Sequence, residues 1–365
     1  MTTENSTQPI KPNKPAGKKH NKVLLGVALG ILVVALIGGG ILLSSLFTSV
    51  MNEPLGEPLV LAATPTAKPN IDPTEQTTEE PVDEGPPPVC GDADEMTLLL
   101  VGTDFRGSNY LYGLADVIRL VHVDFTIPQI NVVAIPRMVL IEDVGPNLDL
   151  AAPALINQTY LFGTQGMGHY SGSGYGAGSL AEAVQINFDV SVDNYFVINF
   201  ATFENFIDSI GGISVTLPAA VDAEPMATFP AGTQWLTGEK ALILARTRKD
   251  SSDHVRINHQ SLIIQGILKR LSDPTVFANF PDVIDSFSSA VMTDLTPTQI
   301  QTGLCMLGKV DPDTIQYFNP GEEELTYART YIPTVSKEMY IFYWDQVFVD
   351  WIHDSMLSTP QVSEE

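Results

Sequence analysis

The feature that most constrains this chain is an uncharged apolar run from Val23 to Phe47. At 1.5 Å per residue, a helix of about 25 residues is long enough to cross a hydrocarbon core of ~30 Å. The run therefore predicts a transmembrane helix. A cleaved signal peptide is the alternative, but the apolar core of such a peptide usually spans only about 7–15 residues.

The residues on either side of this run indicate its orientation. Five lysines precede it with one acid, Glu4, and the segment that follows is acidic. The lysines are Lys11, Lys14, Lys18, Lys19 and Lys22. Because positive charge is retained on the cytoplasmic side, we expect a cytoplasmic amino terminus, a single pass through the cell membrane and an extracytoplasmic domain.

Charge narrows the classes of partner. The whole chain has 19 Lys and Arg against 43 Asp and Glu, a net charge of −24. Without the five lysines and Glu4, 14 basic and 42 acidic residues remain outside. Nucleic-acid binding needs clustered cations that displace counterions, so no nucleic-acid partner is expected. A regulator acting through DNA is also disfavoured, since the basic tail is only about 22 residues long and too short to fold alone.

Composition divides the chain into five parts. We expect a basic cytoplasmic tail at 1–22, the membrane helix at 23–47, a linker rich in Pro, Thr and Glu at 48–95, a globular domain at 96–311 and a carboxyl-terminal extension at 312–365. The stretch of this linker from about Ala62 to Pro88, if extended, reaches roughly 80 Å at ~3.1 Å per residue.

Strand and helix patterns alternate along the globular part, which predicts an α/β layered fold. The first strand is expected near Met96, in the sequence MTLLLV. Further strands are expected at Asp116–Asp124, Ile130–Ile135, Tyr195–Asn199 and Ile213–Leu217, and helices at Leu180–Asn187, Thr202–Ile210, Gly238–Arg246, Val255–Leu271 and Pro297–Leu307. The extension is expected to contain a strand in TIQYF and a helix over Lys337–His353.

Three local features have two interpretations each. The glycine-rich stretch Gly163–Gly178 lacks a nucleotide-binding motif, so it is a loop before the next helix or a lid over a site. Trp344 and Trp351 are expected to pack on the domain, with sugar binding as the alternative. Cys90 and Cys305 lie on the oxidising side of the membrane, where a disulfide is favoured over two free thiols.

No serine-hydrolase or zinc motif is present, and the placement of the arginines is more informative. Arg106 directly follows the first strand, and Arg137 follows the strand at Ile130–Ile135. Arg246, Arg248 and Arg256 lie within eleven residues of one another. Strand exits are where α/β folds place ligand groups, so these arginines predict a site for a multiply charged anion such as pyrophosphate. Structural ion pairs with the many acids are the alternative.

Acidic and polar side chains accompany these arginines. Asp104 and Asp116 lie at the exit of the first strand and the start of the second, where carboxylates beside phosphate predict a Mg²⁺ ion. On the helix after Val255, Arg256, His259 and Gln260 follow i, i+3 and i+4 spacing and are expected to face the same anion.

These motifs together resemble the LytR-CpsA-Psr family of membrane-anchored cell-envelope proteins, over about Met96 to Leu271. Family members have G-S/T-D-x-R after the first strand, and this chain has Gly102, Thr103, Asp104 and Arg106. The family's I-P-R-D is represented by Ile135, Pro136 and Arg137, and its D-x-h-G-G-h-x-V segment by Asp208, Ile210, Gly211, Gly212, Ile213 and Val215. The segment L-x-G-x-x-A-L-x-x-A-R-x-R is represented by Leu236, Gly238, Ala241, Leu242, Ala245, Arg246 and Arg248, and D-x-x-R-x-x-R-Q by Asp253, Arg256, His259 and Gln260.

The resemblance implies a layered central mixed sheet flanked by helices, with a lipid tail held in an apolar tunnel. It also implies transfer of a phosphoglycan from a polyprenyl-pyrophosphate carrier to a cell-wall acceptor polymer, with Mg²⁺ as cofactor. The expected catalytic residues are Arg106, Arg137, Arg246 and Asp253. The expected pyrophosphate ligands are Arg106, Arg137, Arg246, Arg248, Arg256 and Gln260, and the expected metal ligands are Asp104 and Asp116.

The chain departs from the family pattern at three charged positions. Leu114 replaces an arginine, Met138 replaces the aspartate after I-P-R, and His259 replaces the second arginine of the last motif. These changes predict slow transfer that Met138→Asp would raise, or a catalytically reduced protein that only binds polyprenyl-linked glycans. Arg119 could offset the change at Leu114, but strand alternation predicts that it faces away from Asp116.

Overall fold

The structure is a computed structural model that describes residues 50–61, 86–107, 109–247, 253–277, 290–332 and 335–359. The apolar run Val23–Phe47 and the basic tail lie outside these residues. Among the residues described, no helix combines the length and hydrophobicity needed to cross a membrane.

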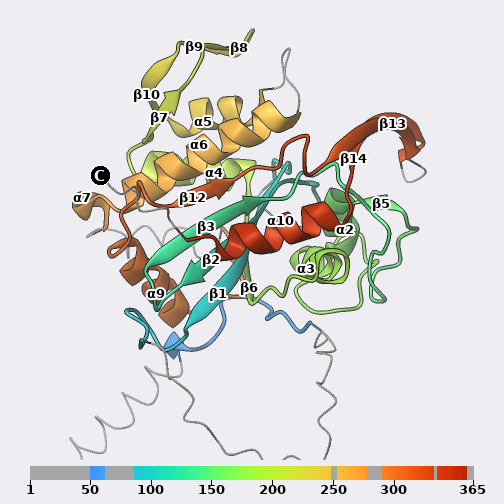
Figure 1. The fold of residues 1–365 in the computed structure, drawn as a ribbon, viewed down its shortest axis with the longest axis horizontal. Helices are drawn as coiled ribbons and strands as arrows, with labels where there is room; N and C mark the ends of the chain where they lie inside the picture. The colour runs from blue at the N-terminus through green and yellow to red at the C-terminus, as the bar shows by residue number, and fades with distance from the viewer. Residues whose placement is uncertain are drawn as a thin grey trace, which may run out of the picture. The chain divides into compact units, whose positions relative to one another are not determined.

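A six-stranded mixed sheet forms the centre of the domain (Figure 1), with strand order β11-β6-β1-β2-β3-β12. The antiparallel strands β1 (Glu95–Thr103), β2 (Ala115–Asp124) and β3 (Gln129–Ala134) lie in its middle. On either side of these three, β6 (Asn194–Asn199) runs parallel to β1, and β12 (Gln316–Phe318) runs parallel to β3. The short strand β11 (Met292–Thr293) pairs antiparallel with β6.

Smaller elements surround this sheet. The helices are α2 (Ile156–Gly163), α3 (Tyr175–Phe188), α4 (Phe200–Ser209), α5 (Gly238–Arg246), α6 (Asp253–Leu271), α7 (Pro274–Phe277), α9 (Pro297–Leu307) and α10 (Gln346–Leu357). Four two-stranded pairs are formed by β4 (Leu140–Ile141) with β5 (Ala154–Leu155), β7 (Ile213–Leu217) with β10 (Gly232–Leu236), β8 (Val221–Ala223) with β9 (Ala227–Phe229), and β13 (Thr326–Ile332) with β14 (Lys337–Tyr343).

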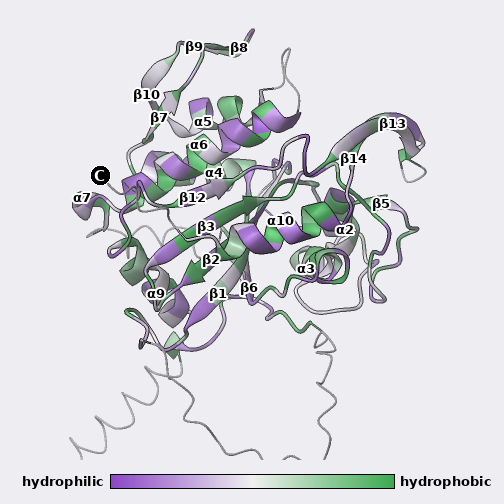
Figure 2. Cartoon of the chain, viewed as in Figure 1, coloured by the Kyte–Doolittle hydropathy of each residue, from purple (hydrophilic) through white to green (hydrophobic). Residues whose placement is uncertain are grey.

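Helices cover both faces of the sheet, as the alternation of β1 requires. Leu99 and Val101 are fully buried in a core that also contains residues of α2, α3 and α10. Leu98 and Leu100 point to the opposite face, toward α4, α5, α6 and α9. Hydrophilic and hydrophobic segments both occur along α6 (Figure 2), as expected of a helix with one buried side. The domain therefore has three layers, which confirms the predicted α/β architecture.

The expected strands and helices within the domain are present, with shifts of a few residues at some ends. The prediction of a helix over Lys337–His353 was wrong in its first half. Lys337–Tyr343 is the strand β14, paired antiparallel with β13, and α10 begins only after Asp345, whose carboxylate accepts from the amide of Val347. The run Tyr340, Ile341, Phe342 has the aromatic and branched residues that favour a paired strand.

The glycine-rich stretch Gly163–Gly178 joins two closely packed helices, α2 and α3. A β-carbon on Gly176 would lie 2.7 Å from the carbonyl oxygen of Tyr160, and one on Gly163 would lie 2.5 Å from Cβ of Ser179. None of these residues lines the cavity described below. The glycines therefore permit a close helix–helix approach, and the lid interpretation has no support.

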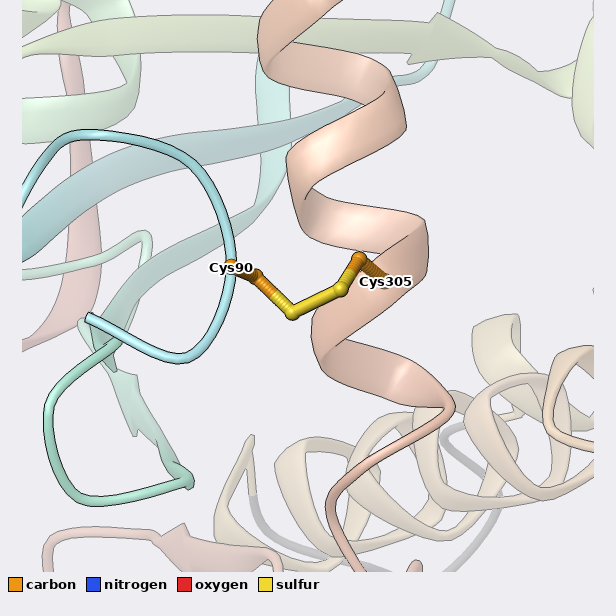
Figure 3. The surroundings of a disulfide bond; sticks show 2 residues. All are labelled: Cys90 and Cys305. Atoms are coloured by element: carbon orange, nitrogen blue, oxygen red, sulfur yellow. A yellow bond between two sulfur atoms is a disulfide. The ribbon is translucent and has the colours of Figure 1, made fainter.

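Segments at both ends of the domain are tied to the sheet. Cys90, before β1, forms a disulfide with Cys305 of α9 (Figure 3), which confirms the favoured pairing. The amide of Leu59 donates to Asp294, next to β11. At the other end, α10 lies across β2 and β3 (Figure 1), so residues after 312 contribute a strand and a covering helix to the same fold.

The two tryptophans of this last segment pack against the domain, as expected. Trp344 Nε1 donates to the carbonyl of Leu140 over 2.8 Å, and its ring meets Phe188 edge to face at 5.1 Å. Trp351 stacks on Phe348 with ring centroids 5.7 Å apart. Both rings fix α10 and its approach to the core.

Candidate functional site

A cavity of about 780 Å³ lies between the central sheet and helices α4, α5, α6 and α9. Most of its wall is aliphatic or aromatic. The sheet contributes Met96, Leu98, Leu100, Val117, Val121, Val123, Ile130, Val132, Phe196 and Ile198. The helices contribute Phe200, Phe203, Phe206, Leu242, Ile263, Ile264, Ile267, Leu268, Leu271, Ile300, Leu304 and Leu307. Such a wall suits a long hydrocarbon ligand.

Charged side chains gather at one end of this cavity. β1 ends at Thr103, β2 begins at Ala115 opposite it, and β3 ends at Ala134 beside Arg119. Antiparallel pairing therefore brings the carboxyl ends of β1 and β3 and the amino end of β2 to the same end of the sheet. Asp104, Arg106, Asp116 and Arg137 all line the cavity there.

A β-bulge at this end of the sheet directs the side chain of Asp116 into the cavity. Gly102 pairs with Val117 and Thr103 pairs with Ala115, so Asp116 is the extra residue on β2. A bulge breaks strict alternation and redirects a side chain. Asp116 therefore lines the cavity together with its neighbour Val117, although strict alternation would place them on opposite faces.

Helices α5 and α6 supply the remaining charged groups. Arg246 is the last residue of α5, and its guanidinium lies 4.7 Å from the centre of the Phe200 ring. Arg256 and Gln260, one turn apart on α6, are 2 % and 5 % exposed and line the cavity. An arginine this buried requires anionic or polar partners, since desolvation of a lone charge is costly.

Carboxylates occupy part of this positive cluster. Asp253, the first residue of α6, lies 2.7 Å from Nη2 of Arg256 and 3.9 Å from Nε of Arg137. Arg137 also pairs with Asp116. The alternative of structural ion pairs therefore holds for Arg137 and Arg256, which also line the cavity, and the anion site stays a prediction. Arg106 and Arg246 add further positive charge to the same cavity.

The predicted residues were brought together to different degrees. Arg106, Arg137, Arg246, Arg256, Gln260, Asp104 and Asp116 line the one cavity. Asp253 contacts two of these arginines without lining it, and Arg248 lies outside the described residues. The expectation for His259 was wrong. It is absent from the cavity wall, since a residue at i+3 is rotated to the opposite side of Arg256 from one at i+4.

The structure places Met138 away from the cavity. Its side chain is 8 % exposed, belongs to the apolar core and does not line the cavity. Its carbonyl accepts from the amide of Phe342 in β14. An aspartate here would be a buried carboxylate, so the expectation that it raises turnover loses its geometric basis. Leu114 also departs from the family pattern. Its backbone amide donates to Asp104 over 2.7 Å and so fixes that carboxylate.

The prediction that Arg119 faces away from Asp116 was wrong. Regular alternation places Arg119 on the cavity side of β2 with Val117 and Val121, and the bulge brings Asp116 to that same side; Arg119 is 1 % exposed. Its Nη2 donates to Gln260 Oε1 at 3.2 Å and to the carbonyl of Ile257. Burial, and secondarily the charge of Arg256, lowers the pKa of Arg119 to about 9. The sequence feature that could have indicated this buried role is a single arginine within an otherwise largely apolar strand.

Gln260 passes this support on to α5. Its Nε2 donates to the carbonyl of Ala245 at 3.3 Å, directly before Arg246. A buried arginine on the sheet thus holds the polar face of α6, and α6 holds the end of α5. This hydrogen-bond chain positions the ends of α5 and α6 that carry Arg246 and Arg256, which both line the cavity.

The carboxylates fit a cation that a phosphate ligand helps to hold. Among the described residues, no group of three or more His, Cys, Asp or Glu side chains is close enough to form a metal cage. Asp104 and Asp116 nevertheless line the same charged end. Mg²⁺ commonly binds one or two carboxylates and completes its octahedron with phosphate oxygens and water. The donor set is therefore compatible with Mg²⁺ in that form.

Comparison with known proteins agrees with the geometry. The model of the LytR_cpsA_psr family matches residues 63–340. A Bacillus cereus protein named polyisoprenyl-teichoic acid--peptidoglycan teichoic acid transferase TagU is 27 % identical over 212 residues, covering 57 % of this chain and 63 % of that protein. The TagU of Halalkalibacterium halodurans is 28 % identical over 205 residues, covering 55 % and 62 %. The match thus spans less than two thirds of either relative.

Solved structures share the fold. TagV of B. subtilis superposes with a TM-score of 0.57 at 20 % identity, covering 72 % of this chain and 96 % of TagV. A structure described as TagT bound to LIIa-WTA gives a TM-score of 0.54 at 18 % identity, covering 72 % of this chain and 89 % of TagT. At this level of identity the likeness concerns the arrangement of sheet and helices alone.

Proposed function

Since the chain belongs to the LytR-CpsA-Psr family, we propose that it transfers a phosphoglycan from a polyprenyl-pyrophosphate carrier to a cell-wall acceptor polymer. The relatives named as teichoic acid transferases support this assignment. The observation that carries it is a single cavity with an apolar wall and an arginine-rich end. An isoprenoid pyrophosphate has the same two parts.

The apolar wall accounts for the carrier. From Met96 to Thr103 the cavity follows β1 for about 23 Å at ~3.3 Å per residue. An isoprenoid tail lying against Leu98, Leu100 and the facing helices would keep its pyrophosphate at Arg106 and Arg137. The tail supplies hydrophobic binding energy, and the arginines determine where the phosphates stop.

The charged end accounts for the chemistry. A hydroxyl oxygen of the acceptor attacks the phosphorus that carries the glycan, and the bond from that phosphorus to the bridging oxygen breaks. The glycan and its phosphate are thereby joined to the acceptor through the new O–P bond. Polyprenyl phosphate is the leaving group and takes up the hydroxyl proton. Arg137, Arg246 and Arg256 stabilise the charge on the phosphoryl oxygens, so positioning and electrostatics supply most of the rate.

We assign three supporting roles within this site. Asp253 orients Arg137 and Arg256 through its ion pairs. Asp104 and Asp116 would hold Mg²⁺, whose chemistry is to neutralise phosphate charge. Gln260 fixes the end of α5 so that Arg246 faces the phosphates.

A second function, binding of polyprenyl-linked glycans without turnover, is favoured by one observation. Part of the arginine charge at the cavity is already neutralised, because Arg137 pairs with Asp116 and Arg256 pairs with Asp253. Such a protein would hold the carrier without releasing polyprenyl phosphate.

Turnover distinguishes the two functions. The full chain in detergent is incubated with a polyprenyl-pyrophosphate-linked glycan and purified cell wall, with and without Mg²⁺. The transferase proposal expects polyprenyl phosphate to be released and glycan to appear on the wall, faster with Mg²⁺. Tight binding with no product under any metal condition would leave the binding protein as the function.

Replacing Arg246 with alanine should weaken the binding of polyprenyl pyrophosphate by roughly 1.5–3 kcal/mol, the range for hydrogen bonds to charged groups. This is about a 10- to 150-fold rise in Kd, measured by isothermal titration calorimetry. Lys269→Ala, a partly exposed cation on α6 that pairs with Asp313, is the control and should bind normally. An unchanged Kd for the Arg246 variant would contradict the shared phosphate site.

We also propose that Val23–Phe47 anchors the protein in the cell membrane, with residues 1–22 in the cytoplasm and the linker at 48–95 leading to an extracytoplasmic domain. The lysines before the run support this topology. Protease added to intact cells should remove the domain. Protection of the domain would reverse the topology, and a mature protein without its first 47 residues would indicate a cleaved signal.

A further inference from the structure

The β13–β14 hairpin carries a row of exposed aromatic side chains. Antiparallel pairing of Tyr327 with Phe342, Arg329 with Tyr340 and Tyr331 with Glu338 places these six residues on one face of the hairpin. Tyr327 and Tyr331 are each 57 % exposed and Tyr340 is 66 % exposed, whereas Phe342 is 6 % exposed and belongs to the main apolar core. We call these six residues the outer face.

The other face of the hairpin is already used. Ile332 and Ile341 are 1 % and 0 % exposed within the main apolar core, and Met339 packs against that core. The hydroxyl groups of Thr330 and Tyr343 share a hydrogen bond. The hairpin is therefore held by its inner side and by Phe342, and folding does not require the exposed tyrosines of the outer face to be buried.

Phe342, at one end of the outer face, contacts residues that adjoin the charged end of the cavity. The Phe342 ring lies 5.1 Å from His254 and 6.5 Å from Tyr327. His254 follows Asp253, the carboxylate that pairs with Arg137 and Arg256. The amide of Phe342 donates to the carbonyl of Met138, the residue after Arg137. A continuous line of contacts thus joins the phosphate site to the hairpin, which projects from the domain in Figure 1.

The chemistry of the outer face suits sugar rings. Tyr327 and Tyr340 lie 6.4 Å apart, and each presents an apolar ring with a hydroxyl at its edge. Between the tyrosines, Arg329 and Glu338 form an ion pair of 3.2 Å that supplies both donors and acceptors. Flat apolar surfaces beside paired polar groups match pyranose rings, which have apolar C–H faces and hydroxyl rims.

The charge of the outer face indicates which kind of glycan it binds. Arg329 and Glu338 cancel, so the outer face has no net charge, while the part of the chain after the apolar run carries 42 acidic and 14 basic residues. A phosphate-rich chain would be repelled by such a domain and would find no excess cation on the outer face. An uncharged sugar backbone meets neither difficulty.

We propose that the outer face of the β13–β14 hairpin binds the pyranose backbone of the acceptor wall polymer and guides a hydroxyl of that polymer toward the phosphate site. This proposal rests on the transferase function proposed above and adds to it the place where the acceptor binds. The donor would enter through the cavity and the acceptor along the hairpin, so the two would meet at Arg137 and Arg256.

The test measures acceptor and donor binding separately, with the full chain in detergent. Acceptor probes are cell-wall sacculi stripped of phosphate polymers and soluble β-1,4-linked N-acetylglucosamine oligomers, and the donor probe is polyprenyl pyrophosphate. The variant is the double substitution Tyr327→Ala and Tyr340→Ala. Its matched control is Tyr327→Phe with Tyr340→Phe, which keeps both rings. Trp235→Ala removes an aromatic ring that is 55 % exposed elsewhere on the surface.

The alanine pair should weaken binding to sacculi and oligomers at least ten-fold, since exposed tyrosines at an interface often act as hot spots. The phenylalanine pair and Trp235→Ala should stay within about three-fold of the unchanged chain. Polyprenyl pyrophosphate should bind all variants alike. If the unsubstituted chain does not bind polyprenyl pyrophosphate, the transferase function is refuted. If it binds polyprenyl pyrophosphate but its acceptor binding does not depend on the tyrosines, only the hairpin proposal is refuted.

Two further outcomes would also overturn the hairpin proposal. Tyrosine-dependent binding of a phosphate-rich glycan, with none of the stripped sacculi, would assign the outer face to the donor. Concentration-dependent self-association that the alanine pair abolishes, measured by analytical ultracentrifugation, would assign it to a second copy of the chain.

Discussion

Replacing Cys90 and Cys305 together with alanine is expected to lower the free energy of unfolding by about 2–5 kcal/mol. The disulfide joins positions 215 residues apart, so its loss releases a large loop in the unfolded chain. Cys90 precedes β1, and Cys305 lies on α9, whose Ile300, Leu304 and Leu307 line the cavity. We therefore expect weaker binding of the lipid carrier as well. Urea denaturation followed by circular dichroism measures the change in stability.

Reduction provides the control for this prediction. A thiol reductant should shift the denaturation midpoint of the unchanged chain by a similar amount and leave that of the double variant where it is. An unchanged midpoint in the double variant would mean that the hydrophobic cluster around Met306, Val310 and Ile315 holds α9 without the bond.

Replacing Met138 with aspartate is expected to lower the free energy of unfolding on the order of 3 kcal/mol or more at neutral pH, without raising turnover. Met138 belongs to the same core as Val139 and Ile341, where a carboxylate would be desolvated with no cation beside it in the apolar cluster. The result differs from what the family pattern alone predicts, because that pattern does not show the direction of this side chain.

The loss at position 138 should depend on pH in a defined direction. Burial raises the pKa of a carboxyl group, so the folded variant would bind a proton more tightly than its unfolded chain. Its destabilisation is then small below the unfolded pKa of about 3.9 and grows as pH rises through the folded pKa. Thermal unfolding between pH 4 and pH 8 measures this trend.

Met138→Leu is the matched control, since it keeps the volume and apolar character and should cost less than about 1.5 kcal/mol at either pH. Faster release of polyprenyl phosphate by Met138→Asp, at unchanged stability, would show that the side chain reaches the phosphate site after all.

Local signals in the sequence determined the ends of several helices. Gly238–Arg246 and Pro297–Leu307 were predicted with the observed bounds, and in the structure each follows a threonine whose hydroxyl accepts from the first turn. The central strands were equally readable, since their buried runs are short and bounded by turn residues. The motifs around Asp104, Arg137 and Arg256 also identified which residues gather at the site.

Only the tertiary structure decided where these side chains point. Lys337–Tyr343 became a strand because β13 pairs with it, and no short window shows a partner across a hairpin. Asp116 and Arg119 reach the same side of β2 because of a bulge, and Met138 points into the core although Arg137 faces the cavity. Spacing along a chain determines which residues are available, but register between strands and the packing of helices determine direction, and both depend on contacts distant in sequence.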